Sequence, residues 1–323
     1  MSDAAYTYAV ARVRAKEVFL LSDADIEQLI TLKTEENCLA FLREKGWGSG
    51  DYKESADEML SVQLSKSWTE VRELVSDKSI FDVLIIPREY HNLKAAIKQV
   101  IADEKADNVY YEDTQFKPEQ LKAMVEKRNF DELPKEMAEA ADLAVETLLQ
   151  TRDGQICDII IDKATLEAVK KIAEITSSPF IKKYALDIVS VANIRIAVRS
   201  AKTGKSKSFM ENAMTRCEGL DVKALIEAAE AGVEKVCDYL GNVGMTELVE
   251  AIKTSPSAFE RWCDNRIMDT IISQKYNSFS EGPIIAYIIA RENEIKTVRV
   301  ILTGKANELD DDFIRERVRK MYV

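Results

Sequence analysis

The sequence predicts an all-α protein built from three similar helical domains. The chain has 323 residues but only 11 glycines and 6 prolines, a composition that favours long helices over a turn-rich β architecture. Apolar residues recur at the three- and four-residue spacing of amphipathic helices along most of the chain. A short motif with the same spacing returns three times at a constant distance, which indicates an internal repeat.

The repeated motif sets the predicted domain boundaries. Its copies are HNLKAAIK at 91–98, ANIRIAVR at 192–199 and NEIKTVRV at 293–300. Corresponding residues lie 101 positions apart, as Leu93, Ile194 and Ile295 do. In each copy a second apolar residue follows three positions later on the same helix face. This period predicts helical repeat domains at 1–105, 106–206 and 207–323.

Local capping chemistry predicts the first helices. An amphipathic helix is expected over 5–21, where apolar residues alternate with arginine and lysine. Ser22 with Asp25, and Ser55 with Glu58, have the spacing of a capping box, so a helix is expected to begin at each pair. The glycine-rich stretch GWGSG between the two pairs predicts a loop.

Helices and linkers are expected to alternate through the rest of the chain. Pro87 predicts a kink or a helix start before the first motif copy. The run 156–166 contains four isoleucines and could form a strand, but its charged residues recur at helical spacing and favour a helix. Linkers are expected at 102–118 and 201–208, and helices over 209–218, 221–240, 246–253 and 313–323.

The composition excludes several classes of function. A formal net charge of -11 argues against nucleic acid as the main partner, because phosphate binding needs a basic surface. The longest apolar runs are far shorter than the ~20 residues that cross a bilayer, so no direct membrane span is expected. Five widely separated cysteines without a CxxC pair, together with a polar N-terminus, predict a reducing cytoplasmic location.

The sequence contains fragments of catalytic motifs, and none is complete. The stretch 202–206 (KTGKS) resembles a phosphate loop, but Arg199 stands where that loop needs glycine, and a flexible linker is the favoured interpretation. His91 is the single histidine, so a histidine-ligated metal site or a catalytic triad has no second imidazole. Acidic runs occupy linker-like positions that are typical of solvated faces. No catalytic residue, cofactor or metal site is expected.

One basic position recurs in every motif copy and is the candidate partner-binding site. Lys94, Arg195 and Lys296 are again 101 residues apart. Around a threefold axis they would form a ring of positive charge able to receive an acidic partner. The alternative is structural, with each side chain paired to a carboxylate of its own unit, for example Glu89.

Three stretches of the sequence resemble a known family. These are YTYAVARVRAKE at 6–17, the mid-chain segment 155–166 with its IIDK, and the arginine-rich end FIRERVRKMYV at 313–323. They are similar to the C subunit of bacterial and archaeal V/A-type ATPases, the counterpart of the d subunit of the eukaryotic V-ATPase. The threefold motif matches the internal triplication of that family. The chain departs from the family at 46–48 and at Glu294, which puts local contacts there in question.

The resemblance implies a funnel-shaped subunit of three helical domains around a pseudo-threefold axis. Such a subunit belongs to the central stalk of the rotor and has no catalytic role. Its implied partners are the D and F shaft subunits and the proteolipid subunits of the membrane rotor ring. It would transmit torque for proton or sodium transport, in the cytoplasm at the inner face of the cell membrane.

Two other classes of function stay open from the sequence. One is a general all-helical scaffold or adaptor outside any rotary ATPase, although solenoid scaffolds repeat every 20 to 50 residues and this period is much longer. The other is an enzyme that uses the loop at Gly204, Lys205 and Ser206 to bind a nucleotide.

Overall fold

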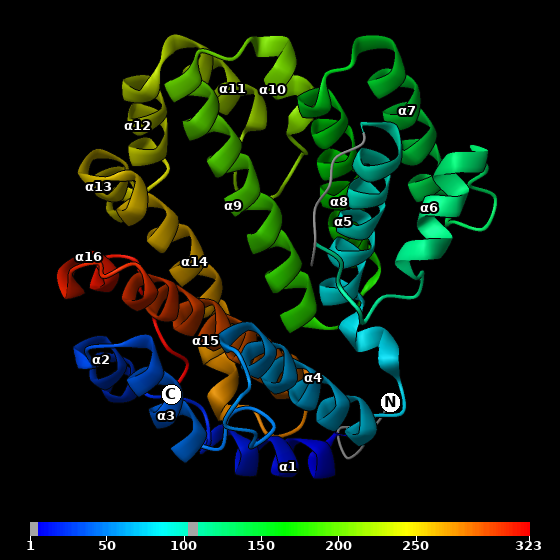
Figure 1. Cartoon of the computed structure of the whole chain (residues 1–323). Helices are drawn as coiled ribbons and strands as arrows, with labels where there is room; N and C mark the ends of the chain where they lie inside the picture. The colour runs from blue at the N-terminus through cyan, green and yellow to red at the C-terminus, as the bar shows by residue number, and fades with distance from the viewer. Residues whose placement is uncertain (1–5, 103–108) are drawn as a thin grey trace. The chain divides into compact units, whose positions relative to one another are not determined.

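A computed structural model describes residues 6–102 and 109–323 (Figure 1). Over these residues the chain forms α-helices and short 3₁₀ helices and no β-strand, so the predicted all-α class is confirmed. The fold divides into two compact units. Unit 1 is Met1–Ile80 with Thr246–Val323, and unit 2 is Phe81–Met245.

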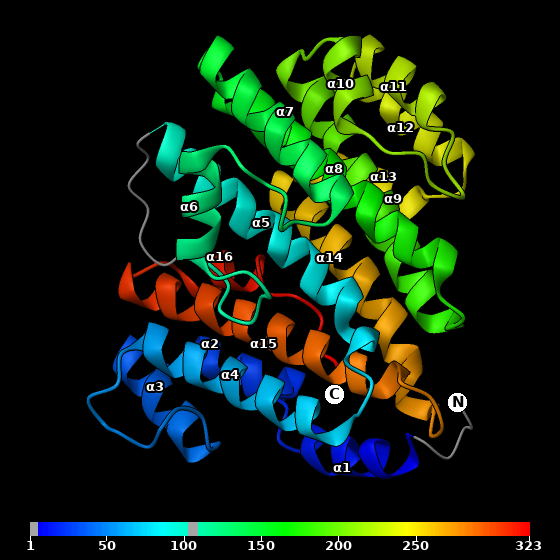
Figure 2. The same cartoon turned by 90° about the vertical axis from the view of Figure 1, so that its right-hand side faces the viewer.

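Unit 1 combines the two ends of the sequence in one core. Its helices are α1 (Thr7–Glu17), α2 (Asp23–Thr31), α3 (Glu35–Glu44), α4 (Ala56–Leu74), α13 (Thr246–Thr254), α14 (Pro256–Ile272), the 3₁₀ helix η3 (Ser273–Tyr276), α15 (Gly282–Ala306) and α16 (Asp311–Arg315). The long helix α15 packs against α4, α1 and α14, and Figure 2 shows it alongside α4. Its Val298 and Ile301 share one apolar cluster with Leu29, Leu42 and Leu60 of the N-terminal helices.

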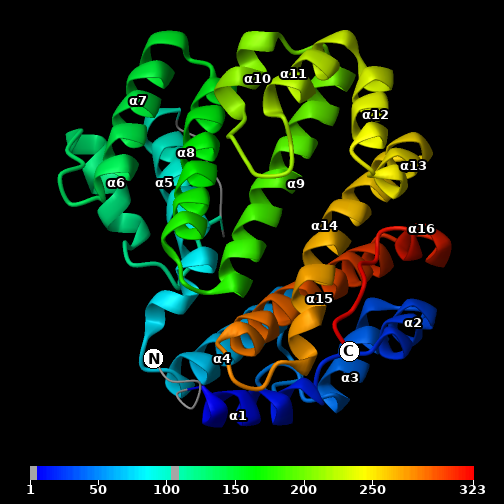
Figure 3. The same cartoon turned by 180° about the vertical axis from the view of Figure 1, so that it is seen from behind.

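Unit 2 is a continuous stretch of the chain. It contains α5 (Asp82–Ile101), α6 (Pro118–Lys127), α7 (Lys135–Thr151), α8 (Gly154–Ile175), α9 (Pro179–Thr203), α10 (Lys207–Ala213), α11 (Val222–Ala231) and α12 (Val233–Asn242). The 3₁₀ helix η2 (Lys78–Phe81) leads into α5. Helix α8 is central, because α5, α7 and α9 all pack on it, as Figure 3 shows from behind.

Several predicted elements are confirmed. Both capping boxes form, with the Ser22 and Ser55 side chains each accepting a hydrogen bond from the backbone N–H three residues on. The GWGSG stretch is a loop, although its Trp47 is buried. Pro87 lies inside α5, five residues after the helix begins at Asp82, and 156–166 lies entirely within α8.

Four local predictions are wrong. The expected helix over 209–218 ends at Ala213. The expected linker 201–208 is mostly helical, because α9 runs to Thr203 and α10 begins after the Ser206 cap. The expected helix over 221–240 is broken at Gly232, whose φ of 116° is incompatible with a helix. The expected final helix 313–323 ends at Arg315. Part of the other expected linker, 103–108, lies outside the described residues.

Each motif copy lies in a long helix with its own set of packing partners. Helix α5 packs on α6, α7 and α8, whereas α9 packs on α8, α11 and α12. Helix α15 packs on α1, α4 and α14. The repeat therefore corresponds to three helices that each organise neighbouring helices. The division at 1–105, 106–206 and 207–323 remains a prediction.

Candidate functional site

The apolar face of the repeated motif lies in the core. Leu93, Ile194 and Ile295 are all buried in their helices. The residues three positions later, Ala96, Ala197 and Val298, have no exposed surface. The apolar stripe predicted from the repeat is therefore the packing face of α5, α9 and α15.

A buried polar residue precedes that stripe and binds the backbone of a distant segment. Asn92 has no exposed surface, and its Oδ1 accepts a hydrogen bond from the backbone N–H of Tyr111 at 2.9 Å. Its Nδ2 donates to the carbonyl of Tyr111 at 2.8 Å and to the hydroxyl of Thr114 at 3.0 Å. Asn92 thereby fixes the connection between α5 and α6.

The second copy repeats this arrangement. Asn193, also fully buried, accepts from the backbone N–H of Thr215 at 3.1 Å and donates to its carbonyl at 2.6 Å. It also contacts the Sγ of Cys217 at 3.3 Å. The side-chain amide replaces a short piece of backbone pairing, so the segment after α10 is fixed to α9 without a strand.

The third copy has Glu294 at this position, and the glutamate joins the two ends of the chain. Its carboxylate accepts a hydrogen bond from the backbone N–H of Leu21 and pairs with Arg291. The neighbouring Asn293 takes over the contact with the following segment, donating from Nδ2 to the carbonyl of Lys320 at 3.0 Å. Asn293 thus contacts the segment that follows, as Asn92 and Asn193 do, and Glu294 makes an additional contact with the N-terminal part of the chain.

The Arg291–Glu294 pair is buried in a partly aromatic environment. Both side chains are at most 2% exposed. The Arg291 guanidinium lies over the rings of Trp47 and Tyr287, at 5.6 and 5.8 Å from their centres. Burial raises the pKa of Glu294 to about 7, although Arg291 and the Leu21 N–H act in the opposite direction.

The basic positions of the motif have different surroundings. Lys94 forms an ion pair with Asp162 of α8, with Nζ 2.6 Å from a carboxylate oxygen. Asp162 lies in the predicted domain 106–206, whereas the structural alternative expects a carboxylate of the unit 1–105, for example Glu89. Arg195 of α9 is half-buried, and Lys296 of α15 is exposed. Lys94 and Arg195 belong to unit 2, and Lys296 belongs to unit 1.

The two chain ends that carry the family resemblance meet in unit 1. Tyr322 is buried, and its hydroxyl donates to the Glu17 carboxylate at 3.2 Å. Arg14 binds the same carboxylate at 2.7 Å and the carbonyls of Gln274 and Asn277 at 2.6 and 2.8 Å. Burial and the Glu17 charge raise the pKa of Tyr322. These contacts fix both ends of the chain to the turn before α15.

The incomplete catalytic motifs have structural roles in the fold. Gly204 ends α9 in the left-handed conformation, and Lys205 donates to the side chain of Gln155 at 2.7 Å. His91 contacts the carbonyl of Val109 at 2.9 Å. Residues 6–102 and 109–323 contain no group of three or more metal-ligating side chains. No helix in these ranges is long and apolar enough to cross a membrane.

Comparison with known proteins identifies the family of this chain. The chain matches the model of the ATP synthase (C/AC39) subunit over residues 9–317. It is 20% identical to the C subunit of the V-type sodium ATPase of Enterococcus hirae, over 96% of this chain and 97% of that protein. It is 23% identical to the C subunit of the A-type ATP synthase of Methanocaldococcus jannaschii, over 97% of this chain and 86% of that protein.

A third relative, the C subunit of the A-type ATP synthase of Thermococcus kodakarensis, is 22% identical over 97% of this chain and 90% of its own length. All three matches therefore extend across nearly the whole chain. The chain belongs to the ATP synthase (C/AC39) subunit family.

Proposed function

We propose that this protein is a non-catalytic central-stalk subunit of a V/A-type rotary ATPase. In this role it is a socket that connects the D and F shaft subunits to the proteolipid subunits of the membrane rotor ring. The family match over residues 9–317 is the observation that carries the proposal. The proposed location is the cytoplasm, at the inner face of the cell membrane.

The mechanical role needs a body that does not deform under torque. Close-packed side chains resist shear, because a small displacement creates clashes and voids at once. Both units have such cores, and the cross-links from Asn92, Asn193 and Glu294 fix the connecting segments to the long helices. These features support a role in torque transmission from the shaft to the ring, coupled to proton or sodium transport.

The proposal includes a funnel of three helical domains around a pseudo-threefold axis, with the shaft received inside it. Lys94, Arg195 and Lys296 contribute positive charge to the shaft contact in this proposal. Lys94 also pairs with Asp162, which neutralises part of its charge.

Binding to the shaft tests the socket function. The purified chain is mixed with the cognate D–F complex and followed by gel filtration and calorimetry. A stable complex is expected, together with co-purification of the chain with membrane-bound ATPase. No binding to the cognate shaft would overturn the proposal.

Charge reversal of Lys94, Arg195 and Lys296 together tests the basic positions. Weaker shaft binding and a smaller dependence of the affinity on salt are expected, since exposed charge pairs are screened by ions. Circular dichroism of the variant checks its folding. Unchanged affinity and salt dependence in a folded variant would make these residues purely structural.

A further inference from the structure

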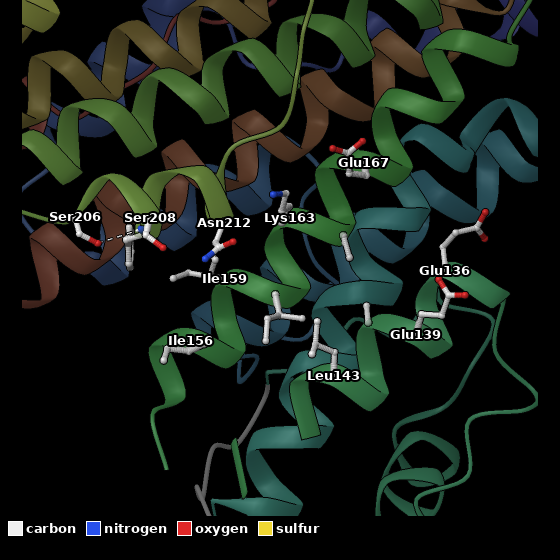
Figure 4. Close-up of a pocket in the computed structure, with 14 residues that line it drawn as sticks. Glu136, Glu139, Leu143, Ile156, Ile159, Lys163, Glu167, Ser206, Ser208 and Asn212 are labelled. Carbon is white, nitrogen blue, oxygen red and sulfur yellow. Dashed lines mark hydrogen bonds between the residues drawn. The ribbon is translucent and has the colours of Figure 1, made fainter. Parts of the chain in front are cut away.

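Unit 2 has a pocket in which basic side chains outnumber acidic ones. It lies between α8, α10 and the start of α11, and its volume is about 570 Å³. It shares Lys163 and Glu167 with the neighbouring groove of α7, α8 and α10, which Figure 4 shows. The charged residues that line the pocket are Lys163, Lys170, Lys207, Arg216 and Lys223 with Glu167, Glu211 and Glu227. Five cations thus face three carboxylates, in a chain whose formal net charge is -11.

Two of the three carboxylates already have a lysine partner. Glu167 pairs with Lys170 of the same helix at 3.6 Å, and Glu227 pairs with Lys207 at 3.8 Å. Lys170 also pairs with Glu174, at 3.7 Å, but Glu174 does not line this pocket. These pairs balance one another, so the excess positive charge belongs to the other basic residues.

Three basic side chains of the pocket have no carboxylate partner. Within the part of unit 2 that the structure describes, Lys163, Arg216 and Lys223 form no ion pair. Lys163 Nζ donates to the backbone carbonyl of Glu211 at 2.8 Å. An ammonium group has three N–H donors, so two remain available. The carboxylate of Glu211 is the single acidic group left against these three cations, which gives an excess of two positive charges.

The backbone positions of these cations are fixed by the fold. Arg216 is exposed, but it follows Thr215, whose backbone N–H and carbonyl are bound by the buried Asn193 at 3.1 and 2.6 Å. Lys223 lies in the first turn of α11, and its backbone N–H donates to the capping side chain of Asp221 at 3.0 Å. Three cations therefore come from three fixed segments, namely α8, the connection after α10 and the start of α11.

The pocket offers little apolar surface to a protein partner. Met214 and Ile226 line it, but each is only 4% exposed. A docked helix takes much of its affinity from apolar side chains that enter a groove, so a helix gains little here. Pockets for small molecules have volumes of about 300–1,000 Å³, and this pocket falls within that range.

We propose that this pocket binds a small molecule that carries a phosphate group. A phosphate monoester has a charge of about −1.5 to −2 at neutral pH and three acceptor oxygens, which matches the charge excess and the three unpaired cations. A single carboxylate has one charge and two oxygens and would leave part of the excess unbalanced. Arg216 can donate two parallel hydrogen bonds to phosphate oxygens, and Lys163 and Lys223 act as point charges.

A free molecule is the expected source of the phosphate group. The same group occurs on lipid head groups, but an anionic bilayer repels a chain with a net charge of -11. The proposal is independent of the socket function, because binding of this ligand requires neither shaft nor ring.

Binding of inorganic pyrophosphate to the full chain tests the proposal. Isothermal titration calorimetry at constant ionic strength, without divalent cations, is expected to show saturable binding to one site. The melting temperature is expected to rise with pyrophosphate concentration, since a ligand of the folded state stabilises it. Citrate, a small carboxylate anion of similar charge, is expected to bind at least about fivefold more weakly.

Matched variants separate the pocket from general attraction to surface lysines. Arg216→Gln and Lys223→Gln are each expected to weaken pyrophosphate binding at least about fivefold. Lys127→Gln removes the same charge at an exposed position of unit 2 outside the pocket, and is expected to leave the affinity within about twofold. All three positions are exposed, so circular dichroism is expected to show folded variants.

Vesicle sedimentation distinguishes a free phosphate from a lipid head group. The chain is expected to stay in the supernatant with vesicles of phosphatidylcholine and phosphatidic acid, as with phosphatidylcholine alone. Co-sedimentation that Lys223→Gln abolishes would overturn the assignment to a free molecule.

Three further results would overturn the proposal. They are the absence of pyrophosphate binding, equal affinity for citrate, or a loss of affinity in Lys127→Gln as large as in the pocket variants. Shaft binding is measured separately, so failure of the pocket leaves the test of the socket function unaffected.

Discussion

Glu294 forms hydrogen bonds of a different kind from those of its counterparts Asn92 and Asn193. The asparagines accept from a backbone N–H and donate to the carbonyl of the same residue, which requires an amide. Glu294 only accepts, from Leu21 and from Arg291, and a carboxylate accepts at both oxygens. The positive charge of Arg291, three residues earlier, partly offsets the cost of burying the Glu294 carboxylate, and the Trp47 ring lies against Arg291.

Glu294→Gln is expected to change how stability depends on pH. A folded-state pKa of about 7, above the ordinary 4.5, means that the native state binds the proton more tightly. The stability from this group is fully present below pH 4.5 and is lost as the pH rises through 7. The shift corresponds to roughly 3 kcal/mol of pH-dependent stability, and glutamine removes this pH dependence because it does not titrate.

Urea unfolding between pH 5 and 8 measures this effect. The free energy of unfolding of the wild type minus that of Glu294→Gln is expected to fall as the pH rises towards 7 and then to level off. Glu234→Gln, at an exposed position, provides the control. Parallel pH profiles for the wild type and Glu294→Gln would contradict the raised pKa.

Tyr322 is expected to stabilise unit 1 chiefly through its ring. Tyr322→Phe removes the hydroxyl that hydrogen-bonds to Glu17 and Arg14, and is expected to lower the free energy of unfolding by about 0.5–1.5 kcal/mol. Tyr322→Ala also leaves a cavity beside α1 and is expected to cost about 3 kcal/mol or more. Chemical denaturation of both variants checks these values, and equal losses would show that the ring contributes little.

At the scale of elements, buried asparagine side chains bind the backbone of connecting segments in this helical fold, as a neighbouring strand would in a sheet. The segment around Thr215 has no helix of its own, and its backbone groups depend on Asn193. The segment around Tyr111 depends on Asn92 in the same way. The long helices therefore carry the polar contacts of their connections as well as the apolar core.

Asn193→Ala is expected to loosen the segment after α10. The backbone N–H and carbonyl of Thr215 lose their partner in a buried place, which costs about 1–3 kcal/mol for each group. A total loss of about 2–4 kcal/mol is expected, with faster hydrogen exchange of the Thr215 amide. Asn242→Ala, on an exposed turn of α12, is the matched control and is expected to change stability by about 0.5 kcal/mol or less. Undiminished protection of Thr215 would contradict this role.

Local chemistry explains which elements could be predicted from the sequence. The caps at Ser22 and Ser55 depend on residues three positions apart, and the structure has both. The prediction of a final helix is wrong, because 313–323 has helical spacing but tertiary contacts decide its conformation. Asn293 binds the Lys320 carbonyl and Tyr322 is buried, which the sequence pattern does not contain.

The same distinction applies to the candidate site. The sequence repeat draws attention to the basic residue of each motif copy. In the structure, the residue two positions earlier makes the hydrogen bonds that fix other segments of the chain. Asparagine is a poor helix former, so its return at a fixed period inside an apolar helix pattern is a signal for a buried hydrogen bond. The environment of Trp47 could not be predicted from the sequence, because its contact with the distant residue Arg291 exists only in the folded protein.

At the scale of the whole molecule, the two units differ in which parts of the chain they contain. Unit 2 is continuous, from Phe81 to Met245, and has its own apolar cluster. Unit 1 needs residues from both ends, because Val298 and Ile301 share a cluster with Leu29 and Leu60. The units therefore have different requirements for folding.

Expression of separate fragments tests this difference. The fragment 81–245 is expected to be helical and to unfold cooperatively by circular dichroism. The fragment 1–80 is expected to lack cooperative unfolding, since its apolar residues have no partner helix, and to gain it when 246–323 is added. A cooperative transition of 1–80 alone would contradict the shared core.

The shared core of unit 1 has a consequence for biosynthesis. A ribosome makes α1 to α4 first, but the helix that completes their core, α15, is made last but one. Until then the apolar faces of the first helices remain exposed and open to chaperones or proteases. A chain whose synthesis stops early would keep that surface exposed, so unit 1 distinguishes complete translation products from truncated ones.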